Sequence, residues 1–170
     1  MEDETPPDVA DVERLADRVV PVWEQVVEDM EATAEEYREE GWAAIECHPG
    51  DVAAVADDIG RTGLDVLLPD NEFDDVQAAY EAEGAFDEVE VFRAEEGGVV
   101  FAVAALLNRT TETALLVPLY YDTTSSQEFL QLVKEEGELR VHLRPLDQRE
   151  VITFTQQNPE LFLPGDDDEE

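Results

Sequence analysis

The longest uninterrupted apolar stretch of the chain is Val99–Leu107, nine apolar residues in a row. A strand with one face in water alternates apolar and polar positions, so this run predicts a strand that is covered on both faces. Polar residues at 108–110 supply a turn, and a second apolar stretch continues to Tyr121. Pro118 cannot donate to a sheet ladder, which predicts a bulge or an edge there. We therefore expect a buried central hairpin, Val99–Tyr121, as the core of the fold.

The first forty residues have the spacing of a helix. Apolar residues recur every three to four positions from residue 8 to residue 40. A proline inside a helix costs ~3 kcal/mol, so Pro21 predicts a kink or two helices, with Pro21 opening the second. Gly41 ends the segment. The apolar stripe favours packing on the protein's own sheet, and the alternative is a partner-binding or coiled-coil face.

The region between this helix and the hairpin alternates strands with helices. The predicted strands are Trp42–Cys47, Leu64–Leu68 and Phe86–Arg93, and the predicted helices are Asp51–Ile59 and Asp70–Gly84. Asp51 suits the N-cap of the first of these helices. A strand, a helix and a strand within residues 42–68 predict a right-handed parallel crossover.

Beyond the hairpin, Ser125 and Glu128 have the spacing of a capping box and predict a helix that ends at Gly137. A last hairpin is expected from two further strands, and a short closing segment follows it. These elements are Leu139–Arg144, Val151–Thr155 and Gln156–Leu163.

Together these elements predict one domain over residues 8–163, of the α/β or α+β class. We expect a mixed sheet of about six or seven strands around the central hairpin, covered by helices, with a long N-terminal helical segment over 8–40. The acidic ends, 1–7 and 164–170, are expected to be disordered.

The charge is extreme, with 45 acidic residues against 10 Lys and Arg and a formal net charge of −35. Such a chain repels itself in dilute salt, whereas molar salt shortens the Debye length to ~3 Å. Acid excess with one lysine, Lys134, is typical of halophilic proteins; the alternative is an acidic binder of basic partners. The charge also argues against nonspecific nucleic-acid binding.

No signal-peptide pattern or membrane-spanning run is present, so a cytoplasmic location is expected. With Cys47 as the single cysteine, no internal disulfide can form.

The strongest candidate for a binding site is the last hairpin. Side chains alternate across a strand, so Arg140, His142 and Arg144 share one face, and Arg149 follows closely. Arginine binds both oxygens of a carboxylate or phosphate, and histidine can donate or transfer a proton. One hypothesis is therefore an anion site. The more ordinary interpretation, which we favour, is an exposed face paired with nearby carboxylates.

A second candidate is His48, in the turn ECHPGD. A turn between a strand and a helix is a common ligand site in α/β folds. Cys47 points to the opposite face from its neighbour, so the two do not form a nucleophile–base pair. A turn histidine beside a buried thiol is the interpretation we favour.

Known metal and cofactor motifs are missing. The acidic run Asp70–Asp75 resembles the start of a calcium loop, but its sixth position is Asp75 instead of glycine, so a helix start is favoured. The chain has no phosphate loop, no G-x-S-x-G elbow and no zinc spacing of Cys and His. We therefore predict no metal and no cofactor.

Three stretches carry a resemblance: GWAAIECHPGDVA, GLDVLLPDNEF, and HLRPL with VITFTQQNPELF. They resemble a family of small, uncharacterised, acidic haloarchaeal proteins over most of residues 41–163. The resemblance implies a high-salt habitat and a common fold. The family has no known activity, so no functional residue is transferred.

Two functions remain open. The first is a non-catalytic, cytoplasmic binding or regulatory protein whose protein partner contacts the Arg140–Arg149 hairpin or the N-terminal helix. The second is a small enzyme or sensor that holds an anionic ligand through Arg140, His142 and Arg144, with His48 or Tyr121 as a further contact. The sequence leaves the oligomeric state open.

Overall fold

The computed structural model describes residues 7–56, 63–147, 151–156 and 159–163, with side chains from residue 21 onward. Its helical elements are α1 (Pro7–Glu39), α2 (Asp70–Glu81), α3 (Gln127–Glu136) and the 3-10 turn η1 (Pro159–Leu161). Its strands are β1 (Ala43–Glu46), β2 (Asp51–Val55), β3 (Gly63–Leu68), β4 (Glu88–Glu96), β5 (Val99–Asn108), β6 (Thr113–Asp122), β7 (Leu139–Pro145) and β8 (Ile152–Gln156).

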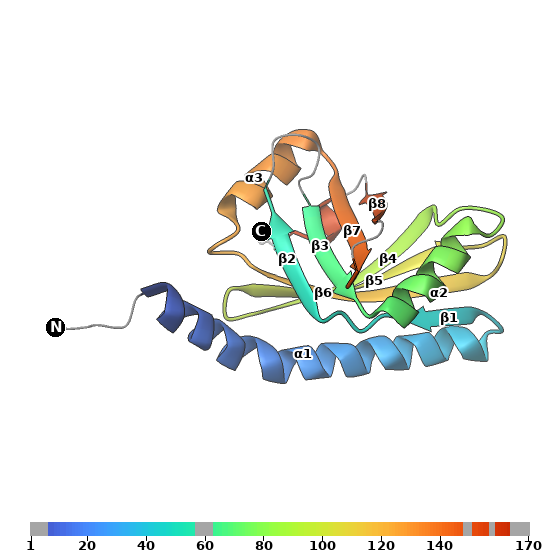
Figure 1. Ribbon diagram of the computed structural model, residues 1–170, viewed down its shortest axis with the longest axis horizontal. Helices are drawn as coiled ribbons and strands as arrows, with labels where there is room; N and C mark the ends of the chain where they lie inside the picture. The colour runs from blue at the N-terminus through green and yellow to red at the C-terminus, as the bar shows by residue number, and fades with distance from the viewer. Residues whose placement is uncertain (1–6, 57–62, 148–150, 157–158, 164–170) are drawn as a thin grey trace, which may run out of the picture.

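The described strands form two mixed sheets of four strands each. Sheet A has the order β1-β6-β5-β4 and sheet B has the order β2-β3-β7-β8. Each sheet contains one parallel pair, β1 with β6 and β3 with β7, and is otherwise antiparallel. The prediction of one sheet of six or seven strands is therefore wrong, and the fold is α+β. Figure 1 shows α1 along one side of sheet A and sheet B on the other.

The central hairpin is confirmed, and the alternation of β5 explains why both its faces are apolar. Val99, Phe101 and Val103 pack with α1, in a cluster that includes Met30 and Ala34. The residues between them point the other way, and Val100, Ala104 and Leu106 pack with sheet B. Every residue of β5 is buried. The strand therefore lies in the middle layer of three.

Pro118 lies where the sheet can tolerate it. Strand β6 pairs with β1 only from Thr113 to Leu116, and with β5 along its whole length. Pro118 is thus beyond the end of the β1 ladder, where a missing N–H costs no hydrogen bond to β1. The predicted edge position is correct for this part of the strand.

The segment from residue 51 begins as a strand, not as the predicted helix. Asp51–Val55 is strand β2, antiparallel to β3, and residues 57–59 of the predicted helix lie outside the described residues. The parallel crossover is also wrong, because β1 belongs to sheet A and β3 to sheet B. Strand β3 approaches β7 closely, since a Cβ added at Gly63 would lie 2.2 Å from the carbonyl oxygen of Arg140.

The helices differ from prediction in their ends. Helix α1 is one element of 33 residues that contains Pro21, not two helices. The capping box predicted for Ser125 and Glu128 is wrong, because the N-cap of α3 is Ser126, which makes no side-chain cap. Ser125 Oγ donates to Asp122 Oδ2 at 3.2 Å. The end of α3 at Gly137, with φ of 71°, is as predicted. Apart from Pro7, the acidic ends lie outside the described residues.

Candidate functional site

A cavity of about 800 Å³ lies between the two sheets, near the open edges of β4 and β8. Its apolar lining comes from both sheets and the C-terminal segment: Val89, Ala104, Leu106, Val117, Leu119, Val141, Leu161 and Phe162. Its size falls within the ~300–1,000 Å³ typical of small-molecule sites. The remaining lining is polar, so this space offers both apolar and polar contacts to a bound molecule.

Three aromatic rings from three parts of the chain form one wall of this cavity. Tyr80 of α2 stacks on Phe86 with 6.3 Å between centroids. Phe154 of β8 meets both rings edge-on, at 5.2 Å and 6.1 Å. Tyr80 is 44% exposed, so the wall reaches the protein surface.

The charged groups around the cavity are acidic. Glu88 and Glu90 border it, but their carboxylates are engaged elsewhere: Glu88 pairs with Arg109 at 2.7 Å, and Glu90 accepts a hydrogen bond from the Tyr37 hydroxyl at 2.7 Å. Asp87 is the other carboxylate among the lining residues, and none of the described lining residues is basic. The lining therefore disfavours an anionic molecule.

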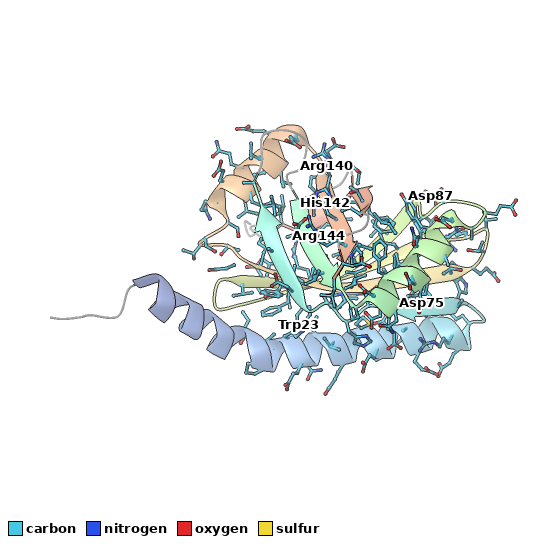
Figure 2. All side chains as sticks on the ribbon, in the orientation of Figure 1. Trp23, Asp75, Asp87, Arg140, His142 and Arg144 are labelled. Carbon is cyan, nitrogen blue, oxygen red and sulfur yellow. The ribbon has the colours of Figure 1, made fainter. Side chains whose placement is uncertain are left out.

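The arginine face predicted on the last hairpin is present. Figure 2 shows Arg140, His142 and Arg144 in succession along β7, while Val141 and Leu143 between them are in the core. Neither described arginine is free of carboxylates. Arg140 binds Glu136 at 2.8 Å and Glu138 at 3.1 Å, and Arg144 binds Asp65 at 3.0 Å. Arg149 lies outside the described residues.

Two details of this face bear on its chemistry. His142 is 8% exposed, and its Nδ1 lies 2.9 Å from Thr153 Oγ1. The Nε of Arg144 is the one side-chain nitrogen or oxygen in the described residues that is buried without a hydrogen-bond partner. The face is thus internally paired, with one unused donor.

His48 does not precede a helix, so the reason for its selection is wrong, yet its ring lies close to three glutamates. Its Nδ1 lies 2.7 Å from Glu72 Oε2, and its Nε2 lies 3.0 Å from Glu31 Oε2 and 3.9 Å from Glu46 Oε1. Its backbone N–H also donates to Glu72 at 2.7 Å. Sequence reasoning missed these glutamates because they come from three separate elements.

These contacts set the protonation of His48. Burial is the largest single influence and lowers the pKa of His48, but hydrogen bonds and charges from Glu72 and Glu31 together outweigh it. The net result is a raised pKa. By contrast, burial raises the pKa of the Cys47 thiol, with smaller contributions from Glu72 and Asp75. Cys47 is fully buried and is not a nucleophile in this state.

Tyr121 and the acidic run at residue 70 have structural contacts. The hydroxyl of Tyr121 donates to the carbonyl oxygen of Phe162 at 2.7 Å, and the C-terminal segment also accepts hydrogen bonds from Arg93. Asp70 lies in the first turn of α2 and accepts the N–H of Leu146 at 2.9 Å. Tyr121 therefore fixes the segment that closes one end of the cavity.

Comparisons with known proteins give a family and no activity. No helix in the described residues is both long and apolar enough to span a membrane. Searches of curated proteins and of solved structures found no match to the chain. One family model matches residues 9–164, nearly the whole chain. The chain therefore belongs to this family, a family of unknown function designated DUF7529.

Proposed function

We propose that this protein is a non-catalytic binding protein that holds a small, apolar or amphipathic molecule in the cavity between its sheets. The observation that carries the proposal is the cavity itself, about 800 Å³, with apolar and polar residues from both sheets in its lining and an aromatic wall that reaches the surface. The absence of basic residues among the described lining residues favours a neutral or cationic ligand over an anion.

The described residues offer little support for catalysis at this cavity. Its polar lining residues are Tyr80, Asp87, Glu88, Glu90, Thr153, Thr155 and Gln156, and both histidines and the cysteine lie outside it. Glu88 and Glu90 are engaged by other side chains. A binding role therefore accounts for the geometry without a reacting group.

The setting we propose for this binding is the cytoplasm of a cell with concentrated internal salt. The support is the net charge of −35 with a single lysine, which is self-repulsive unless salt screens it. Binding through apolar and aromatic contacts suits such a setting, because salt does not screen these contacts as it screens ion pairs.

The test is thermal unfolding in molar KCl against neutral, cationic and anionic small molecules. A ligand at 100 times its Kd stabilises a protein by ~2.7 kcal/mol, which is easily measured. Ala104→Leu places a larger side chain into the cavity and should abolish the shift. Ala105→Leu is the matched control, because the adjacent alanine faces α1 and leaves the cavity unchanged.

Two results would contradict the proposal. One is that no neutral or cationic compound in the panel shifts the thermal unfolding transition. The other is a ligand that binds Ala104→Leu as tightly as the original protein, since such a ligand would sit elsewhere.

A second candidate function is anion binding on the outer face of β7. The observation that favours it is the buried Nε of Arg144 without a partner in the described residues. Against it, Arg144 already pairs with Asp65, and Arg140 already pairs with Glu136 and Glu138. Anionic members of the panel test it: a stabilising anion that is lost in Arg144→Lys, which removes the guanidinium but keeps the charge, would favour this function.

A further inference from the structure

We propose that Glu31, Glu46 and His48 form a binding site for a divalent first-row transition-metal cation. One donor atom from each residue lies within 4.8 Å of the other two. The residues come from α1, from β1 and from the turn after it, so the fold brings them together. In a chain with 45 acidic residues, this is the one such group among the described residues.

Residues outside the donor set hold two of the three donors in place. Glu72 Oε2 lies 2.7 Å from His48 Nδ1 and orients the ring so that Nε2 faces Glu31 and Glu46, and a metal ion would take the place of the proton that Nε2 shares with Glu31 Oε2 at 3.0 Å. Metal-bound histidines usually have such a carboxylate on the other ring nitrogen. Arg38 binds Glu46 Oε2 at 2.9 Å and leaves Oε1 as the atom nearest His48.

The charges around the group also favour a cation. Glu31, Glu46 and Glu72 all lie beside His48, and Arg38, which binds Glu46, is shared with Glu35. A divalent cation would therefore enter a strongly acidic setting.

The donor set indicates the class of metal. One imidazole nitrogen with two carboxylates suits Zn²⁺ and related first-row ions, whereas Mg²⁺ and Ca²⁺ prefer oxygen ligands alone. The side chains of His48 and Glu31 are 40% and 46% exposed, so water can complete the coordination. The sequence could not predict this site, because its residues do not follow any metal-binding spacing.

The experiment is a calorimetric titration of the chelator-treated full chain with Zn²⁺ in molar KCl, with histidine NMR as a second readout. We expect one equivalent of Zn²⁺ to bind and to shift the ring nitrogens of His48 but not those of His142. His48→Ala and Glu31→Gln should each weaken binding at least tenfold. Glu28→Gln, one turn away on the same helix with the same charge change, should leave it unchanged.

Glu72→Gln tests the positioning role, because the amide can still accept a hydrogen bond but carries no charge. We expect Glu72→Gln to weaken Zn²⁺ binding, because loss of such an outer partner typically costs ~10–100-fold in metal affinity. The proposal is overturned if Zn²⁺ binds His48→Ala as tightly as the original chain, or if Glu28→Gln loses as much affinity as Glu31→Gln. It is also overturned if Mg²⁺ at equal concentration displaces Zn²⁺, since the binding would then be that of an acidic surface.

Discussion

The two faces of sheet A are covered in different ways. On one face, α1 follows the sheet, and Met30 and Ala34 are completely buried against it. On the other face, the strands of sheet B run across those of sheet A (Figure 1), and the sheets leave a cavity of about 800 Å³. A helix can follow a twisted sheet closely, whereas two twisted sheets that cross diverge at their corners. The difference shows why a hollow occurs on the sheet B side.

The largest effect is expected on the helix side. Met30→Ala should lower the free energy of unfolding by ~2–5 kcal/mol, because it leaves a hole in a closely packed layer. Denaturant unfolding in molar KCl measures the loss. Met30→Leu, which keeps the volume, should cost less than about 1.5 kcal/mol. Equal losses for the two variants would show that volume is not what Met30 contributes.

A smaller effect is expected for a similar truncation on the cavity side. Leu119 is buried but lines the cavity, so Leu119→Ala removes fewer packing contacts and should cost ~2 kcal/mol, the low end for such changes. The same denaturant experiment gives the value. A loss as large as that of Met30→Ala would mean that the cavity closes around Leu119 in solution.

Added volume should also cost more on the helix side than on the cavity side. Ala105→Leu forces extra atoms between β5 and α1 and should cost ~1–3 kcal/mol, whereas Ala104→Leu extends into the cavity and should cost less than about 1 kcal/mol. The midpoints of thermal unfolding compare the two directly. If both variants lose the same stability, the two faces of β5 are equally packed and the comparison fails.

The smallest change tests whether the sheet B side is loose everywhere or only at the cavity. Cys47 belongs to that core cluster, is fully buried, and has a pKa raised first by burial and then by Glu72 and Asp75. Only the thiolate reacts, so the thiol should resist a disulfide reagent at mildly alkaline pH until denaturant unfolds the chain. Reaction in the folded state, followed by absorbance, would indicate a loosely packed core around Cys47.

Local patterns were sufficient for several elements. The unbroken apolar run gave the buried hairpin, because a strand between two layers needs apolar side chains on both faces. Period-two alternation correctly placed Arg140, His142 and Arg144 on one face of β7. In both cases the information lies within one strand and its neighbour in sequence.

The errors arose where distant pairing decides the outcome. The segment from residue 51 has apolar residues that fit a short helix or a short strand, and its pairing with β3 makes it β2. The division into two sheets depends on the parallel pairs β1 with β6 and β3 with β7, which leave no local signal. Two of the glutamates around His48, Glu31 and Glu72, likewise come from distant elements, so no local pattern placed them there.

The two parallel pairs also determine when the molecule can fold during synthesis. Helix α1 and β1 are made first, but their partners β5 and β6 come near the middle of the chain, and β3 must wait for β7. At about 5–20 residues per second, the apolar face of α1 leaves the ribosome several seconds before the hairpin that covers it. Neither sheet can close until most of the chain is made, so folding should be late and cooperative. A truncated chain should therefore expose the apolar face of α1 and the apolar faces of the unfinished sheets.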